Sequence, residues 1–382
     1  MEFGLTDEQR LLHDEIVRLA QRELTPGARE RDRNEEFSME LWKRCAEMGL
    51  QGLPVPPNYG GTGLDPVSTA IALEALGYGC EDGGLVFSLC AHLLACVVPI
   101  WLHGNEQQKR RWLPRLCGGS LIAVNAMTEP DSGSDAFAMR TYAEAEGNTF
   151  RLHGAKTFCS NAPIADLALV YAVTDREKGY HGGITAFLVE SDAPGFQLGQ
   201  TFSKMGLRTS PIGELVLDDV RVSAENILGG IGGGGAVFVE SMDWERTLIG
   251  ACHVGVMRRL LENSIEHARE RTAAGQPIGK YQSVSNRIVD MKIRLEASRL
   301  LVLRAAWKLG RSRDVALDAS AAKVFVSEAL LQTTLDAVRT LGGYGFMVDH
   351  EAERALRDSV GGLLYSGTND IQRNVVARWL GL

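Results

Sequence analysis

The sequence predicts an α+β protein in which a middle antiparallel β-domain separates two helical domains. Apolar residues recur at helical spacing up to about residue 120. Short β-branched or alternating runs, separated by turn residues, then continue to Leu228. Helical spacing returns from residue 236. We therefore expect an N-terminal α-helical domain over 1–120, a β-domain over 121–230 and a C-terminal α-helical domain over 231–382.

The first helix has clear start and stop signals. Thr6 and Gln9 have the spacing of a capping box, the apolar residues that follow lie on one helical face, and Pro26 ends the helix. Pro and Gly mark residues 54–65 as a loop. Further helices are expected around 38–49, 66–78, 86–102 and 105–116.

The β-domain is predicted from runs such as "TFRLHGAKTFCS", "DLALVYAVT" and "ELVLDDVRV". The glycine run "GGIGGGG" (229–235) follows it. Because no Lys-Ser or Lys-Thr pair follows, as it would in a phosphate-binding loop, we interpret this run as a flexible linker that caps the next helix. Further on, Val289, Ile293, Ala297 and Leu300 mark one long amphipathic helical face.

Composition excludes several classes of function. The chain has 382 residues and a net charge of −8 without a basic stripe, so we expect no nucleic-acid partner. The seven cysteines have no C-x-x-C spacing, which indicates reduced core thiols in a cytoplasmic protein. The eight histidines show no metal-binding spacing, and no signal peptide is visible. The apolar run 86–102 contains His92 and Pro99, and we expect a buried helix there and no membrane partner.

One carboxylate lies on an apolar helical face. Phe238, Met242, Glu245 and Ile249 fall at positions i, i+4, i+7 and i+11. A buried carboxylate needs either a partner or a cavity, and desolvation would raise its pKa toward that of a good general base. Two interpretations remain open: Glu245 is a catalytic base, or an arginine from elsewhere pairs with it. Glu240 and Asp243, in contrast, are expected on a solvated face.

Several motifs occur in an order typical of one family. They are "AMTEPDSGSD" (126–135), "GAKTFCSNAPIAD" (154–166), "KMGLRTS" (204–210), "LGGYGF" (341–346) and "YSGTNDIQR" (365–373). Together they resemble the acyl-CoA dehydrogenase superfamily over essentially the whole chain. The resemblance implies a C-terminal four-helix bundle, non-covalently bound FAD, and a homotetramer in which a neighbouring chain completes part of each FAD site.

The resemblance also implies contacts with the flavin ring. Met127, Thr128 and Ser134 would line one side of the ring, with their hydroxyl groups reaching its polar edge. Phe158 and Ser160 would lie on its other side.

The remaining cofactor contacts would come from two places. Thr368 and Asp370 would meet the ADP portion of FAD. Arg271, Gln282 and Arg339 would reach it from the partner subunit. Arg339 stands near the position of the family's glutamine, where a cation is still suited to a pyrophosphate.

Ser366 stands where the family usually carries its catalytic glutamate, and a serine cannot deprotonate an α-carbon. One branch, which includes isovaleryl- and long-chain acyl-CoA dehydrogenases, carries its base in a D-x-E-R context instead. "MDWER" resembles that context and assigns the base to Glu245, with Asp370 as a weaker rival. Ser366, Gly367 and Arg246 are then expected around the substrate, with the Ser366 N–H polarising the thioester carbonyl.

The implied reaction is α,β-dehydrogenation of a thioester, with an electron-transfer flavoprotein or oxygen as the final acceptor. "SLCAHLLACVVP", "SNAPIAD" and "QSVSNRIVDMK" resemble the dehydrogenases that oxidise prolyl and similar groups on carrier proteins in secondary metabolism. Three functions remain open: a carrier-protein thioester dehydrogenase, a dehydrogenase of short or branched acyl-CoA, and an inactive flavin-binding scaffold. Basic residues that could meet an acidic carrier protein, or simply be solvated, are Arg110, Arg111, Arg258 and Arg259.

Overall fold

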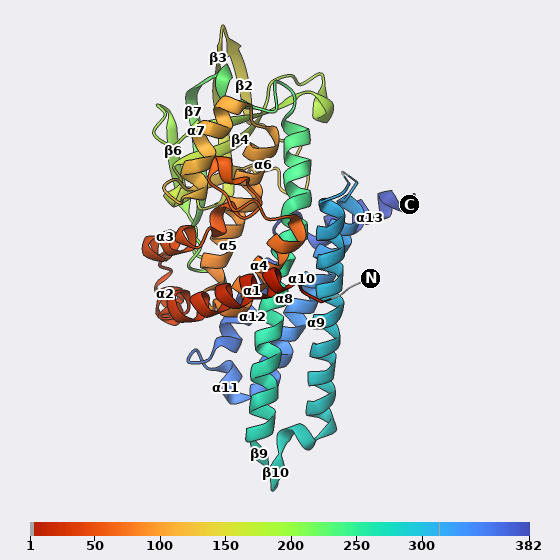
Figure 1. Ribbon diagram of the computed structural model, residues 1–382. Coiled ribbons are helices and arrows are strands. Elements are labelled where there is room, and N and C mark those ends of the chain that lie inside the picture. The colour runs from red at the N-terminus through yellow and green to blue at the C-terminus, as the bar shows by residue number, and fades with distance from the viewer. Residues whose placement is uncertain (1–3, 313) are drawn as a thin grey trace.

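The computed structural model describes residues 4–312 and 314–382. Figure 1 shows a β-rich end, a group of short helices beside and below it, and long helices that extend from there to the opposite end of the molecule. This arrangement confirms the predicted fold class. The N-terminal helices are α1 (Asp7–Leu19), α2 (Ala28–Asn34), α3 (Met39–Glu47), α4 (Pro66–Gly79), α5 (Gly83–His92), α6 (Val98–His103) and α7 (Glu106–Cys117).

The predicted capping box is present at the start of α1. The Thr6 side chain accepts a hydrogen bond from the Gln9 N–H, and the Gln9 side chain accepts one from the Thr6 N–H. After Leu19 the helix widens into one π-helical turn, Ala20–Leu24, and ends before Pro26.

The apolar run expected to form one helix forms three segments. They are α5, a π-helical turn (Leu93–Val97) and α6. Residues 83–103 have the length and hydropathy of a membrane span, but 78% of their most apolar window is buried inside the fold, so they form a core helix. His92 ties this helix to the β-domain because its Nδ1 accepts a hydrogen bond of 3.0 Å from the Ala123 N–H.

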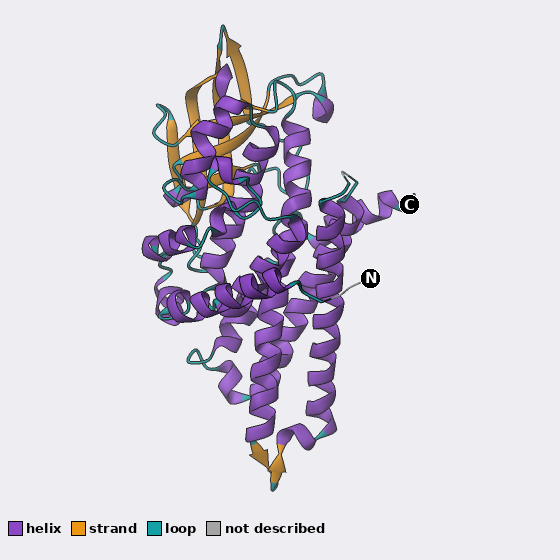
Figure 2. Cartoon of the chain, in the orientation of Figure 1, coloured by secondary structure: helices purple, strands orange, loops and turns teal. Residues whose placement is uncertain are grey.

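The β-domain contains one mixed sheet (Figure 2). Its spatial order is β6-β7-β3-β2-β4-β5-β8, with β1 beside β4. Most neighbours are antiparallel, as expected, but β1 and the end of β2 pair parallel with β4. The strands are β1 (Ala123–Ala126), β2 (Tyr142–Glu146), β3 (Thr149–Ser160), β4 (Leu167–Val173), β5 (Ile184–Glu190), β6 (Phe196–Thr201), β7 (Ile212–Ser223) and β8 (Ile227–Leu228).

The C-terminal region is built on α8 (Gly234–Glu270), which packs against α4, α9 and α10. Glycines permit the close approach of α4 and α8. A Cβ on Gly77 would lie 2.1 Å from the Cys252 carbonyl oxygen, and one on Gly255 would lie 2.1 Å from that of Glu74. The other elements are β9 (Thr272–Ala273), β10 (Gln276–Pro277), α9 (Gln282–Leu309), α10 (Ala316–Leu341), α11 (Gly343–Phe346), α12 (Glu351–Gly361) and α13 (Asn369–Trp379).

The glycine run before α8 is more tightly packed than the expected flexible linker. Gly229, Gly230 and Gly232 adopt positive φ angles, and Gly234 and Gly235 already belong to the first helical turn. Gly234 is buried so close to β5 that a Cβ would lie within 3 Å of its backbone. The run therefore makes a sharp turn that packs the start of α8 against the sheet.

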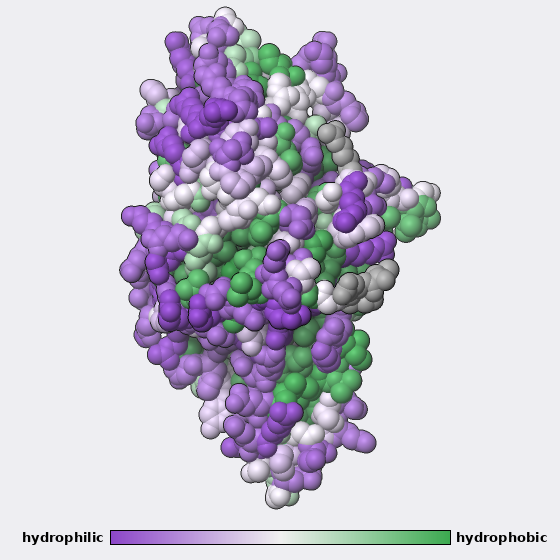
Figure 3. Space-filling view, viewed as in Figure 1, coloured by the Kyte–Doolittle hydropathy of each residue, from purple (hydrophilic) through white to green (hydrophobic). Residues whose placement is uncertain are grey.

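The amphipathic face predicted around 289–300 does lie on a helix, α9, but most of its apolar side is left exposed by the described residues. Val289, Ile293, Leu300 and Trp307 are between 51% and 60% exposed. Figure 3 shows hydrophobic residues gathered on the surface over α9. The buried side of the same helix carries Met291, Leu295, Ser298, Val302, Ala305 and Ala306.

The seven cysteines are all buried and form no disulfide, as their spacing predicted.

Candidate active site

Glu245 lies on α8 with only 8% of its surface exposed. Met242 and Ile249 on the same face are also buried, so the predicted apolar stripe is present. Desolvation raises the pKa of Glu245, while a hydrogen bond from Ser366 and the positive charges of Arg246 and Lys323 partly oppose that rise. The carboxylate therefore has the environment of a strengthened base.

Ser366 contacts this carboxylate directly. Its hydroxyl group donates a hydrogen bond to Glu245 Oε1. Arg246, the neighbour of Glu245 on α8, donates from Nε to the Ser366 carbonyl oxygen over 3.0 Å and so binds the backbone. Within residues 4–312 and 314–382, no lysine or arginine forms an ion pair with Glu245. The alternative of an ion-paired structural glutamate is therefore not realised in the described chain.

The turn that carries Ser366 is held from several sides. Ser366 is in the left-handed region, with φ of +57°. The Asn369 N–H closes the turn on the Leu363 carbonyl over 3.0 Å. Lys323 Nζ lies 2.7 Å from Asn369 Oδ1 and 3.5 Å from the Leu363 carbonyl oxygen. These contacts fix both ends of the turn.

The turn also leaves two backbone donors available. In the described part of the chain, no hydrogen bond is formed by the N–H groups of Ser366 and Gly367. Gly367 has a φ of +81°, and a Cβ there would meet the Gln372 amide at 2.5 Å, so glycine is required at this position. Free N–H groups beside a buried carboxylate can polarise a carbonyl oxygen.

Asp243 departs from the prediction of a solvated side chain. It is buried, and its Oδ1 has no hydrogen-bond partner among the residues described. Arg246 is 4.0 Å away, and desolvation raises the pKa of Asp243 to about 6. The reason for the error is that both sides of α8 are covered here, so this stretch has no solvated face. Glu240 is partly exposed and lies 3.0 Å from His103.

The residues expected to line the flavin ring lie on the β-domain. Met127 and Thr128 directly follow β1. Their carbonyl groups are fixed by β3, because Lys156 Nζ donates to the Met127 carbonyl over 3.1 Å and the Thr157 N–H donates to that of Thr128 over 2.8 Å. The buried Lys156 also lies 2.8 Å from the Glu129 carboxylate. The loop after β1 is therefore rigidly attached to the sheet.

Phe158 is unusual for a large apolar residue in a strand. It is 61% exposed and has a φ of +52°. Its ring centroid lies 5.2 Å from that of Phe202, and Ser160 ends the same strand. Ser134 is exposed in the loop after β1. An open aromatic surface near hydroxyl groups fits a planar ring with a polar edge.

Thr368 and Asp370 lie at the start of α13. Thr368 is the N-cap, and its side chain accepts a hydrogen bond of 3.3 Å from the Ile371 N–H. The Asp370 side chain is 93% exposed and faces Arg373 at 3.6 Å. Asp370 is therefore not a desolvated carboxylate, which weakens it as a rival for the role of base.

The third predicted group lies at the opposite end of the long helices. Arg271 follows the last residue of α8, Gln282 begins α9, and Arg339 lies in the last turn of α10. All three side chains are exposed. Arg271 follows Glu245 by 26 residues, about 39 Å along a helix at 1.5 Å per residue. These residues do not join Glu245 within one chain.

The basic residues considered for carrier-protein contact all have acidic partners. Arg259 is buried against Glu351 at 2.6 Å and is not a surface residue, contrary to the expectation. The other three form surface ion pairs within the chain: Arg110 with Glu106, Arg111 with Glu190, and Arg258 with Glu262.

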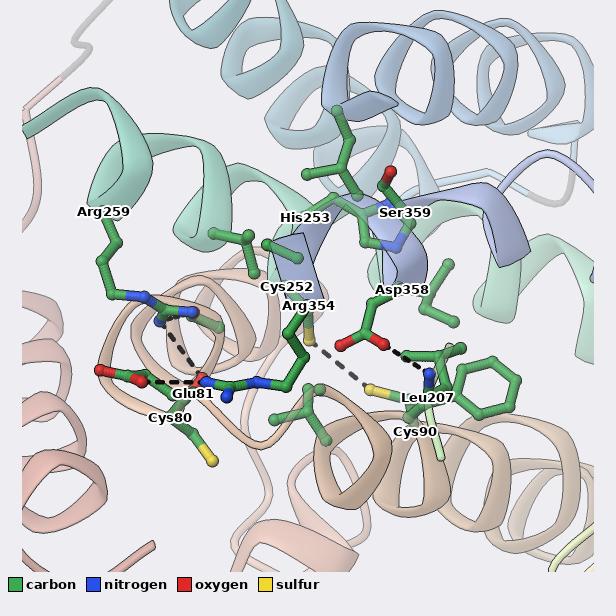
Figure 4. Close-up of a pocket in the computed structure, with 18 of the residues that line it drawn as sticks. Cys80, Glu81, Cys90, Leu207, Cys252, His253, Arg259, Arg354, Asp358 and Ser359 are labelled. Atoms are coloured by element: carbon green, nitrogen blue, oxygen red, sulfur yellow. Dashed lines mark hydrogen bonds and ion pairs between the residues drawn. The ribbon is translucent and has the colours of Figure 1, made fainter. Parts of the chain in front are cut away.

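A cavity that the sequence analysis missed lies beside the next turns of α8 (Figure 4). Ile249, Cys252 and His253 line it and follow Glu245 at i+4, i+7 and i+8, the same helical face. The His253 ring nitrogen Nε2 is 2.7 Å from the Tyr365 hydroxyl. The spacing from Glu245 was visible in the sequence, but the opposite wall comes from α4, α5 and α12 and was not.

Comparison with known proteins divides the chain into the same N-terminal, middle and C-terminal regions. Family models of the N-terminal, middle and C-terminal domains of acyl-CoA dehydrogenases match residues 6–120, 125–220 and 232–381. The chain is 41% identical over 382 residues to an L-prolyl (peptidyl-carrier protein) dehydrogenase of Serratia sp., covering 100% of this chain and 99% of the relative. It is 42% identical over 384 residues to the protein of that name from Pseudomonas fluorescens, covering 100% of both.

A solved structure described as PigA with FAD and proline is similar throughout. It has a TM-score of 0.98 and 41% sequence identity, and the match covers 100% of both chains. The similarity therefore extends over all three regions, including α8 and the turn that carries Ser366. The chain belongs to the acyl-CoA dehydrogenase family.

Proposed function

We propose that this chain is an FAD-dependent dehydrogenase that introduces an α,β double bond into an aminoacyl or acyl thioester, with a prolyl group on a carrier protein as the preferred substrate. The names of its relatives from Serratia and Pseudomonas support the prolyl substrate. The observation that carries the proposal is the buried Glu245 carboxylate, which lacks an ion-pair partner among the residues described and lies beside free backbone donors. An inactive scaffold has no reason to keep such a carboxylate desolvated.

The residues of the β-domain fit a bound flavin. Phe158 offers an exposed aromatic surface in a strained backbone conformation, and Thr128 and Ser160 supply hydroxyl groups nearby. Met127 and Ser134 complete this group. When bound, FAD supplies the acceptor for the hydride that leaves the β-carbon.

Residues of this chain acidify the α-carbon of the substrate and remove its proton. The Ser366 N–H, with no partner among the described residues, donates to the thioester carbonyl oxygen and makes the α-carbon more acidic. Glu245 takes the proton, and because Ser366 occupies Oε1, Oε2 is the oxygen that accepts it. Arg246 and Gly367 keep the turn in place, Arg246 through its bond to the Ser366 carbonyl. Burial excludes water from the carboxylate.

A short or branched acyl-CoA is the second candidate substrate. The cavity beside Glu245 favours it, because its lining includes the apolar Val86, Phe87 and Ile249.

The active enzyme is a homotetramer in which a neighbouring chain completes the FAD site. Arg271, Gln282 and Arg339 gather too far from Glu245 to act on the same cofactor, while an exposed apolar stripe along α9 offers a surface for a second copy. Thr368 and Asp370 meet the ADP portion. Either an electron-transfer flavoprotein or oxygen takes the electrons, and a cytoplasmic location fits the seven free thiols.

The test is anaerobic reduction of the bound flavin by a matched set of thioesters. The set contains prolyl-carrier protein, unloaded carrier protein, butyryl-CoA and isovaleryl-CoA. Rapid bleaching by the prolyl-carrier protein alone supports the first substrate. Bleaching by the CoA esters alone supports the second, and no bleaching by any thioester of a yellow protein would contradict both. Admitting oxygen afterwards shows whether the reduced flavin reacts with oxygen directly.

A further inference from the structure

The cavity in Figure 4 lies along α8 and begins one helical turn beyond Glu245. Ile249 is the lining residue of α8 that is nearest in sequence to Glu245, one helical turn away, and Cys252 and His253 follow on the same face. Tyr365 lines the cavity directly before Ser366, whose hydroxyl group binds the base. An acyl group whose α-carbon lies at Glu245 and whose remaining atoms extend along this face would enter the cavity.

The free space in the cavity is small, about 60 Å³. An apolar cavity of about 150 Å³ is known to hold a benzene ring. The present cavity has less than half that volume and therefore accepts only a few carbon or nitrogen atoms without rearrangement.

Charged groups close the end of the cavity that is remote from the base. Arg259 and Glu351 form an ion pair of 2.6 Å there, and Arg354 lies 3.0 Å from Glu81. Asp358 also lines the cavity and accepts a hydrogen bond from the Leu207 N–H. These groups are already largely buried and paired, and a long alkyl chain that reached them would lie against charged atoms to which it cannot hydrogen-bond, which is unfavourable.

His253 occupies the middle of the cavity wall. Its Nε2 is 2.7 Å from the Tyr365 hydroxyl group, and its Cε1 would be 3.4 Å from a Cβ at Gly362. The imidazole therefore lies between the Tyr365 phenol and the backbone at Gly362, which follows α12. Burial lowers the pKa of His253 to about 4, so the ring is neutral at pH 7.

We propose that His253 is the residue that determines acyl-group size in this enzyme, limiting it to a short group or small ring. The inference rests on the proposed function, because it assumes that a thioester reacts at Glu245. Beyond its α- and β-carbons, a prolyl group has only three ring atoms left, two carbons and one nitrogen. That remainder matches the small free volume, and a hexanoyl or octanoyl chain does not.

The experiment measures anaerobic flavin reduction by propionyl, butyryl, hexanoyl, octanoyl and prolyl thioesters on one common carrier. The wild-type holoenzyme is expected to accept the prolyl and short acyl groups and to reject hexanoyl and octanoyl. His253→Ala is expected to raise kcat/KM for hexanoyl about tenfold or more, since each methylene group accommodated in an apolar pocket is worth about tenfold. His253→Phe refills the space without a hydrogen bond and should keep the wild-type preference.

The outcomes distinguish a role of His253 in limiting acyl-group size from a purely structural role. A folded, yellow His253→Ala protein with an unchanged chain-length preference would overturn the inference. Efficient oxidation of octanoyl by the wild-type enzyme would do the same, even if the alanine variant did not fold. If no thioester reduces the wild-type flavin, the proposed function fails and this inference with it. Tyr365→Phe, which keeps the ring but loses the bond to His253, should relax the preference less than His253→Ala does.

Discussion

The hydroxyl group of Ser366 donates a hydrogen bond to Oε1 of Glu245, although the two residues lie 121 positions apart in the chain. The residue at the position where the family usually carries its base therefore contacts the proposed base, which comes from another helix. A hydrogen bond to the ionised carboxylate favours that form, whereas burial of Glu245 opposes it. The pair sets both the direction of the carboxylate and its basicity.

Replacing Glu245, the proposed base, should stop the reaction without loss of the fold. Glu245→Gln keeps the shape of the side chain but cannot take a proton, so the anaerobic rate of flavin reduction should fall by about 10²-fold or more. FAD content and the thermal midpoint should change little. Glu266→Gln, an exposed site on the same helix, is the matched control and should retain full activity. An unchanged rate in Glu245→Gln would assign the base to another residue.

Removing the hydroxyl group of Ser366 should shift the pH profile. In Ser366→Ala the ionised form of Glu245 loses its hydrogen bond, so the pKa of this carboxyl group rises further. Because the base must be ionised, the rate of flavin reduction should rise with pH in both proteins, with the midpoint at higher pH in the variant. At high pH the two rates should converge. A profile with the wild-type midpoint would show that the bond has no effect on the base.

Lys323 is expected to act as a positioning residue. Its Nζ binds Leu363 and Asn369 at both ends of the turn, and its positive charge lowers the pKa of Glu245. Lys323→Met should therefore move the midpoint of the pH profile upward and also lower the thermal midpoint. Lys323→Arg keeps the charge and should restore most of the pH profile. If both variants lose stability but keep the wild-type midpoint, the role of Lys323 is only structural.

The apolar stripe on α9 should hold subunits together. Ile293→Asp and Leu300→Asp place a charge on this exposed face, so the molar mass measured by light scattering should fall below that of the wild-type assembly. FAD should be lost in parallel if, as proposed, arginine and glutamine side chains of the partner subunit contact it. Lys292→Gln, beside the stripe, is the control and should remain assembled. A fully assembled Leu300→Asp protein would place the subunit contact elsewhere.

Asp358 should make stability depend on pH. Burial raises its pKa from 3.8 to about 7, so the folded state binds this proton more tightly than the unfolded state does. Its contribution to stability is complete below pH 3.8 and is lost as pH rises to about 7, at most on the order of 4 kcal/mol at about 1.4 kcal/mol per pKa unit. Asp358→Asn should flatten this fall in the free energy of unfolding, measured by urea denaturation across the same pH range.

Several features were predictable because they depend on residues close together in the chain. The capping box at Thr6 and Gln9 and the order of helical and β-rich regions follow from spacing and turn residues. The apolar face around Glu245 is also local, since residues four and seven apart on a helix share a face. The order of motifs along the chain was enough to indicate the family.

Other features depend on segments that meet only in the folded protein. Asp243 was expected in solvent, but neighbouring elements cover both sides of α8, so it is buried. The stripe at Val289 and Ile293 has the pattern of a core face, yet no part of the described chain packs on it. Helical periodicity shows that one face is apolar, but it does not show what covers that face.

The cavity beside Glu245 depends both on local sequence and on segments that are distant in the chain. One wall is a single face of α8, and its residues can be read from their spacing. The facing walls come from α4, α5 and α12, and Tyr365 reaches His253 across 112 positions of the chain. The volume and polarity of a cavity are set by how such distant segments pack, and close packing leaves no local signal of it in the sequence. Local patterns therefore indicated Glu245 as the candidate base, and only the tertiary structure showed the cavity beside it.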